Sequence, residues 1–70
     1  MEKTEIKRIE AYLRRKFQLP AIRVVQRAQK DGSAEVNIGD EFIGVLFRDE
    51  DEGEVSYAFN MAILDIDLDE

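Results

Sequence analysis

The sequence predicts a single small α+β domain, in which one N-terminal amphipathic helix packs on a four-stranded antiparallel β-meander. Apolar residues recur at helical spacing over residues 4–17. After Pro20 the apolar period changes to two, which is typical of strands. Glycine-containing turn pairs separate the alternating segments. The whole chain, residues 1–70, is the right length for one domain.

The expected helix covers residues 4–17. One helical stripe carries four apolar residues: Ile6, Ile9, Leu13 and Phe17. Thr4 is the expected N-cap, because a threonine hydroxyl accepts a hydrogen bond from the first helical turn. Pro20 disfavours helical geometry in the residue before it. The helix should therefore end near Phe17 or Gln18.

Four strands are expected after the helix, over residues 22–29, 34–38, 41–48 and 54–64. Asp31-Gly32 and Gly39-Asp40 are turn signals between the first three, and the second pair fits a type II′ turn. Residues 49–53 form an expected acidic loop, and residues 65–70 an acidic C-terminal tail. A curled SH3-like sheet and a further short strand over residues 65–68 are alternatives to the simple meander.

The turns also predict the register of the sheet. With a two-residue turn at Gly39-Asp40, and Arg48 paired with Glu54, one set of side chains lies under the helix: Ala34, Val36, Ile38, Ile43, Val45, Phe47, Val55, Tyr57, Phe59 and Met61. The opposite face then carries Glu35, Asn37, Phe42, Gly44, Leu46, Ser56, Ala58, Asn60 and Ala62. Exposed apolar clusters often mark an interface. Phe42 and Leu46 are therefore candidate partner-binding residues.

Charge is distributed unevenly along the chain. The net charge is -6, but residues 1–30 hold nine Lys/Arg and three acids (+6), while residues 31–70 hold one base and thirteen acids (-12). Such asymmetry is a hint of nucleic-acid or membrane contact at the basic end. Our preferred interpretation is that the two halves attract each other within one fold.

Arg8, Tyr12 and Arg15 lie on one stripe of the expected helix and are candidate partner-binding residues. With Arg23 and Arg27 of the first strand, they would form a patch for phosphate contacts, and Tyr12 would stack on a base. Glu2, Glu5 and Glu10 interrupt this patch, and the chain has no recognisable nucleic-acid-binding signature. Nucleic-acid binding is therefore the second choice.

Three sequence stretches are distinctive: residues 10–15 (EAYLRR), 34–49 (AEVNIGDEFIGVLFRD) and 61–68 (MAILDIDL). Together they resemble a small proteobacterial family known only as a domain of unknown function, and the resemblance spans nearly the whole chain. It implies a stand-alone bacterial protein with no assigned activity, cofactor or catalytic residue.

The catalytic inventory is thin. Cysteine and histidine are absent, which removes the commonest general base, the thiol nucleophile and the usual zinc, haem and iron–sulfur ligands. Ser33 and Ser56 do not lie in a Gly-x-Ser-x-Gly context, and no glycine-rich phosphate loop occurs. We therefore expect no catalytic residues and no cofactor, so that the protein is not an enzyme.

Two acidic segments are candidate metal sites. Residues 49–54 begin like an EF-hand loop, but Gly53 occupies the third ligand position, which favours an acidic loop. Asp65, Asp67 and Asp69 would hold Mg²⁺ or Ca²⁺ only weakly. We expect helix cations to neutralise them instead, from among Lys7, Arg8, Arg14 and Arg15. No metal site is therefore predicted.

The sequence favours a non-enzymatic protein-interaction or regulatory module. The candidate partner-binding residues are Phe42, Leu46, Arg8, Tyr12 and Arg15. The expected partner is another protein or a second copy, as a homodimer. So small a core usually needs further stabilisation, and without cysteine and histidine oligomerisation is the remaining source of it. No apolar run is long enough for a membrane span and no signal peptide is visible, which favours the cytoplasm.

Overall fold

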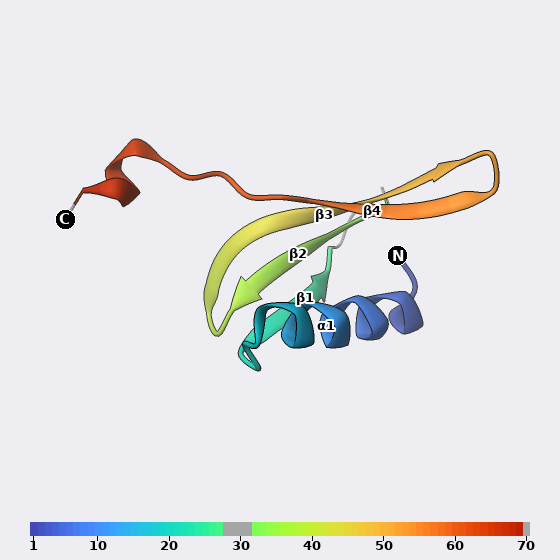
Figure 1. The fold of residues 1–70 in the computed structure, drawn as a ribbon, viewed down its shortest axis with the longest axis horizontal. Coiled ribbons are helices and arrows are strands. Elements are labelled where there is room, and N and C mark those ends of the chain that lie inside the picture. Colours follow the sequence, from blue (N-terminus) through green and yellow to red (C-terminus); the bar gives the residue numbers. More distant parts are fainter. Residues whose placement is uncertain (28–31, 70) are drawn as a thin grey trace.

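The computed structural model describes residues 1–27 and 32–69. The elements in chain order are α1 (Lys3–Phe17), β1 (Ile22–Gln26), β2 (Ser33–Ile38), β3 (Glu41–Asp51), β4 (Glu54–Asn60) and the 3₁₀-helix η1 (Asp65–Leu68). The strands form one antiparallel sheet in the order β1-β2-β3-β4, and α1 lies against one face of it (Figure 1). The predicted α+β class and the meander are confirmed.

α1 begins slightly earlier than predicted and ends where predicted. Glu2, and not Thr4, is the N-cap residue, and its N–H donates to Glu5 Oε1 at 3.1 Å. At the other end Gln18 adopts the left-handed conformation (φ 53°), and the next N–H donates to the Arg14 carbonyl at 3.0 Å. Such a left-handed residue is a common helix C-cap.

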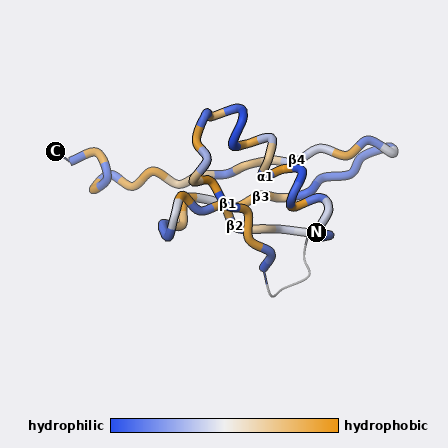
Figure 2. Tube along the Cα trace, turned by 90° about the horizontal axis from the view of Figure 1, so that it is seen from below, coloured by the Kyte–Doolittle hydropathy of each residue, from blue (hydrophilic) through white to orange (hydrophobic). Residues whose placement is uncertain are grey.

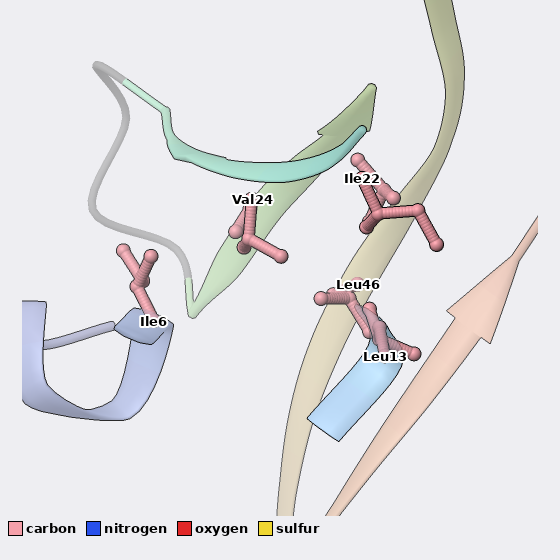
Figure 3. Close-up of a cluster of buried hydrophobic side chains, with 7 residues drawn as sticks. Ile6, Leu13, Ile22, Val24 and Leu46 are labelled. Atoms are coloured by element: carbon pink, nitrogen blue, oxygen red, sulfur yellow. The ribbon is translucent and has the colours of Figure 1, made fainter. Parts of the chain in front are cut away.

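The hydrophobic core is small and lies between α1 and the first three strands. Its buried members are Ile6, Leu13, Ile22, Val24, Ala34, Val36 and Leu46. Figure 3 labels five of them, contributed by α1, β1 and β3. Of the predicted helical stripe, Ile9 is only partly buried and Phe17 is exposed. The last turn of α1 therefore extends past the core.

Two side chains of α1 fasten it to the outer edge of β1. The Val24 N–H donates to Glu10 Oε2 at 3.0 Å, and Arg14 Nε donates to the Ile22 carbonyl at 2.8 Å. Glu10 and Arg14 also form an ion pair at 3.4 Å. An edge strand leaves backbone polar groups without a strand partner. Here side chains of the helix supply that partner.

The register of β2 against β3 departs from the prediction after the turn. A β-bulge shifts the pairing between Val36 and Asn37, so that Val36 lies opposite Gly44 and Ala34 lies opposite Leu46. A bulge adds one residue to one strand, which exchanges the faces of everything beyond it. Leu46 therefore turns toward the helix and is 2% exposed. The expected outward position of Leu46 is wrong.

The predicted acidic loop over residues 49–53 is also wrong. β3 continues to Asp51, and a two-residue turn at Glu52-Gly53 leads into β4. Both turn residues have positive φ (51° and 83°), as a type I′ hairpin turn requires. Arg48 consequently pairs with Tyr57 and not with Glu54.

The strands differ from their predicted lengths at two other places. β1 ends at Gln26, and the predicted continuation to residue 29 and the Asp31-Gly32 turn fall partly outside the described residues. β4 ends at Asn60, four residues before the prediction. Residues 65–68 form η1 and no further strand.

The molecule is elongated for its mass. It measures 45 × 23 × 23 Å with a radius of gyration of 13.0 Å, against about 11 Å for a compact domain of this length. Its accessible surface is 5751 Å², whereas a compact monomer of 8.1 kDa exposes about 4,500 Å². The β3–β4 hairpin and the C-terminal tail project at opposite ends (Figure 1).

Candidate functional site

α1 leaves a groove between itself and the helix-facing side of β4. This α1–β4 groove has a volume of about 740 Å³. Its principal lining residues are Arg8, Tyr12 and Arg15 from α1, and Leu46, Tyr57 and Phe59 from the sheet. The groove therefore combines an apolar and aromatic floor with a basic wall.

The structure brings four of the five predicted partner-binding residues together. Arg8, Tyr12, Arg15 and Leu46 all line the α1–β4 groove. Phe42 does not, because it follows the Gly39-Asp40 turn and is 55% exposed away from the groove. The predicted apolar patch of Phe42 with Leu46 is therefore wrong, since the bulge places Leu46 in the core.

The basic wall of the groove lacks ion-pair partners. Arg8, Arg15 and Lys16 form no ion pair with any residue that the structure describes. Arg14, on another side of the helix, pairs with Glu10. No cation of α1 pairs with a described acid of the chain's second half. The expected attraction between a first-half cation and a second-half acid occurs instead at Arg27, which pairs with Glu35 at 3.8 Å.

Tyr12 and Arg15 contact each other on the groove wall. The Arg15 guanidinium carbon lies 5.8 Å from the centroid of the Tyr12 ring. This distance is within the range of a cation–π interaction. Tyr12 is nevertheless 48% exposed. The pair therefore presents an aromatic surface together with a positive charge.

A polar cluster closes one end of the groove. The Tyr57 hydroxyl donates to Glu5 Oε2 at 2.5 Å, and Arg48 Nε donates to the same oxygen at 3.0 Å. Arg48 also pairs with Glu50 at 3.4 Å. The cluster joins the first turn of α1 to β3 and β4. The sequence did not predict it, because its members meet only through the shifted register.

The hydrogen bonds of this cluster change the pKa values of its members, including those of Glu5 and Tyr57. The Tyr57 hydroxyl, the Glu2 N–H and the Arg48 guanidinium hold the pKa of Glu5 below its ordinary range, against the opposing effect of desolvation. The pKa of Tyr57 is raised, first by its hydrogen bond to the Glu5 carboxylate and then by desolvation. Glu5 is therefore held ionised and Tyr57 neutral at neutral pH.

A second hollow, of about 620 Å³, lies on the other side of β3. It is lined by Phe42, Val45 and Phe47 and by Met61 and Leu64 of the segment after β4. No lysine or arginine contributes to it. This apolar hollow thus differs in charge from the α1–β4 groove.

The C-terminal tail, residues 61–69, carries large apolar side chains in water. Met61, Ile63, Leu64, Ile66 and Leu68 are each between 54% and 73% exposed. In Figure 2 this segment shows hydrophobic and hydrophilic positions side by side, away from the body of the domain. Nothing in the described part of the chain buries these side chains.

The aspartates of the tail are also without cationic partners. Asp67 Oδ2 accepts a hydrogen bond from the Leu64 N–H at 3.0 Å, which closes η1. No described lysine or arginine lies within 4.0 Å of Asp65, Asp67 or Asp69. The expectation that cations of the chain's own helix neutralise them is therefore wrong.

Residues 1–27 and 32–69 contain neither a cluster of metal ligands nor a membrane-spanning helix. Within these ranges, no group of three or more His, Cys, Asp or Glu residues is placed to hold a metal ion. No helix in the same ranges is both long and apolar enough to cross a membrane.

The fold and the groove define a small α+β domain with a basic, aromatic groove beside one edge of its sheet. The chain belongs to the family described as Protein of unknown function (DUF3126), whose family model matches residues 5–67. This match confirms the resemblance to a domain of unknown function, while its restriction to proteobacteria stays a prediction. No curated protein and no solved structure matches the chain.

Proposed function

We propose that this protein is a non-enzymatic protein-interaction module that binds an acidic, apolar segment in the α1–β4 groove. The observation that carries the proposal is the combination of Arg8, Tyr12 and Arg15 on one wall, with no acidic partner among the described residues. Cations next to an apolar floor favour a ligand that carries both chemistries.

The residue types of the groove support this proposal. Tyrosine and arginine are over-represented among the residues that dominate binding energy at protein interfaces. Tyr12 and Tyr57 supply aromatic area, while Leu46 and Phe59 supply the apolar floor. Charges at the rim of an interface act mainly on specificity and association rate. Arg8 and Arg15 would accordingly select acidic partners.

The polar groups at the end of the groove argue for binding and not for catalysis. Arg48 and Tyr57 both donate hydrogen bonds to the Glu5 carboxylate. A catalytic constellation would direct such groups toward a reacting atom. The three side chains instead connect α1 to the hairpin, which keeps the groove in shape.

A selection from displayed random peptides tests the proposal. We expect the wild-type protein to enrich peptides that combine Asp or Glu with large aliphatic residues. Calorimetry on the selected peptides should show binding that Arg8→Glu/Arg15→Glu weakens by at least about tenfold, because two attractive rim charges become repulsive.

Lys3→Glu/Lys7→Glu is the matched control, because it makes the same change of charge on α1 at residues outside the groove. Equal losses in both double variants would show that only net charge matters. Selected peptides without acidic residues would contradict the proposed specificity.

Nucleic-acid binding is the second candidate function, favoured by the exposed Tyr12–Arg15 pair beside Arg8. A base would stack on Tyr12 while the guanidinium groups contact phosphates. Fluorescence anisotropy with labelled single-stranded DNA and RNA tests it at two salt concentrations. Binding that persists at moderate salt and is lost in Tyr12→Ala would support this alternative, and no binding at low salt would end it.

A further inference from the structure

The tail and the α1–β4 groove have complementary properties within one chain. The tail joins exposed apolar residues to Asp65, Asp67 and Asp69, none of which has a described cationic partner. The groove joins an apolar floor to Arg8 and Arg15, which have no described acidic partner. The groove supplies the cations that the aspartates of the tail lack, and the tail supplies the acids that the arginines of the groove lack.

The tail does not reach the groove of its own chain. It leaves the end of β4 and runs away from α1, as Figure 1 shows. Leu64 and Asp67 border the hollow on the other side of β3, and no residue of the tail lines the α1–β4 groove. The remaining tail is thus presented for contact with another molecule.

The dimensions of the two surfaces also agree. Residues 61–64 run as a stretched coil in Figure 1 and would span about 13 Å at 3.3 Å per residue. η1 adds about 8 Å at 2.0 Å per residue. α1, with 15 residues, is about 22 Å long. The length of the tail therefore matches that of α1, which forms one wall of the groove.

We infer that the protein is a reciprocal homodimer in which the tail of each copy, residues 61–69, lies in the α1–β4 groove of the other. This inference rests on the proposed function, and it names the occupant of the groove as a second copy. In a two-fold pair each copy gives one tail and receives one, so both surfaces are used twice.

The exposed area agrees with a missing partner. The accessible surface of 5751 Å² exceeds that of a compact monomer of this mass by about 1,250 Å². A standard interface removes about 800 Å² from each partner. The surplus surface of one copy is thus large enough for an ordinary dimer interface.

Sedimentation velocity on the full chain and two charge-reversed variants is the test. Asp65→Lys/Asp67→Lys/Asp69→Lys has a basic tail and the natural basic groove, whereas Arg8→Glu/Arg15→Glu has an acidic groove and the natural acidic tail. We expect a wild-type dimer, and self-association of each variant weakened by roughly 100-fold or more, because both variants place like charges together.

Mixing the two variants is the decisive step. The basic tail of the first matches the acidic groove of the second, and the natural tail of the second matches the natural groove of the first. A one-to-one mixture should therefore form a heterodimer although neither variant forms a homodimer. Controls with the same charge changes elsewhere, Asp49→Lys/Asp51→Lys/Glu52→Lys and Lys3→Glu/Lys7→Glu, should remain homodimeric.

Several outcomes would overturn the inference. A wild-type monomer at all concentrations, variants that remain dimeric, or a mixture of folded variants that stays monomeric would each do so. If a variant fails to fold by circular dichroism, isotope-filtered NMR on mixed labelled and unlabelled wild type decides. Contacts between Leu68 of one copy and Tyr12 of the other are expected, and purely intramolecular contacts contradict the dimer.

The failure of this inference and the failure of the proposed function are separable. A monomer that still selects acidic, apolar peptides in the Arg8/Arg15-dependent manner would keep the groove as a binding site for other proteins. A dimer that survives both charge reversals, together with no peptide selection, would remove both proposals.

Discussion

Gly44 is the residue at which the approach of β4 leaves no room for a side chain. A Cβ at this position would lie 2.5 Å from the Asn60 carbonyl oxygen and 2.6 Å from the Cε1 atom of the Phe59 ring. Contacts this short require the neighbouring strand to move. Gly44 lies opposite Val36, next to the bulge. The absence of a side chain at Gly44 therefore goes with the shifted register of the two strands.

We therefore expect Gly44→Ala to lower the free energy of unfolding by about 1–3 kcal/mol, the usual cost of overpacking. Urea denaturation followed by circular dichroism measures this loss. Ala58→Ser, at an exposed position of β4, serves as the control and should remain within about 0.5 kcal/mol of wild type. An unchanged denaturation midpoint in Gly44→Ala would contradict the close approach.

The Glu5–Tyr57 hydrogen bond makes stability dependent on pH at both ends of the scale. Glu5, whose folded pKa is lowered, stabilises the fold above the ordinary glutamate pKa of about 4.3. This contribution is lost as the pH falls through the lowered folded value. Tyr57, whose folded pKa is raised, contributes fully below about pH 10, and its contribution is lost as the pH rises through the raised value.

Tyr57→Phe should accordingly raise the pKa of Glu5 toward its ordinary range, because the largest cause of the shift is removed. Carbon-detected NMR of the Glu5 carboxylate across acidic pH measures this change. In a Tyr12→Phe background, Tyr57 is the only tyrosine, and tyrosinate absorbance should show its raised pKa. A Glu5 pKa that is insensitive to Tyr57→Phe would refute the hydrogen bond.

At the scale of elements, β1 depends on α1 for its outer edge. Glu10 accepts from the Val24 N–H, while Arg14 donates to the Ile22 carbonyl. Helix and strand thus share hydrogen bonds as well as apolar contacts. Because a buried backbone donor without a partner loses free energy, this fastening fixes the position of the helix on the sheet.

We predict that Glu10→Ala destabilises the protein by about 1–3 kcal/mol, since the Val24 N–H loses its acceptor and Arg14 loses its ion pair. Glu10→Gln should lose less, because its amide oxygen still accepts from Val24. Urea unfolding gives both values, and faster exchange of the Val24 amide hydrogen locates the effect. Lys7→Ala is the control, expected within about 0.5 kcal/mol.

Local sequence signals predicted the helix and strands well. They predicted only in part which side chains of β3 lie on which face of the sheet. The helical stripe, Pro20 and Gly39-Asp40 gave the boundaries of α1 and the β2–β3 turn within about two residues. The bulge and the Glu52-Gly53 turn were missed, because alternation continues through a bulge and because a run of acids suggested a loop. Leu46 and Val45 exchanged faces as a result.

The sequence predicted the groove residues of α1 from helical spacing and not from turns. Arg8, Tyr12 and Arg15 share a helical stripe, which helical spacing alone defines. Their neighbours Tyr57 and Phe59 come from β4, and only the register of the hairpin places them across the groove. Sequence periodicity thus predicts one wall of a site, whereas the opposite wall depends on turns.

At the scale of the whole molecule, the tail adds exposed apolar surface without adding to the core. Residues 63–69 are all exposed, and none belongs to the core cluster. In a monomer such a segment would contribute little to stability. In the inferred dimer it would contribute strongly, and the contribution would depend on protein concentration.

Truncation after Ala62 distinguishes a monomer from the inferred dimer. The shortened chain should keep its circular dichroism spectrum and show a Tm that does not change with protein concentration. The wild-type Tm should rise with concentration, as expected of a dimer that unfolds to monomers. Differential scanning calorimetry over a hundredfold concentration range makes the comparison. A wild-type Tm independent of concentration would contradict the dimer.

The two outer edges of the sheet differ in how they are covered. The β1 edge is occupied by Glu10 and Arg14 of its own helix, whereas the β4 edge has no described neighbour. A sheet that is open at both ends is a template for continuous strand addition and fibrils. Since side chains of α1 cover the β1 edge, the helix removes one of the two ends at which strands could be added.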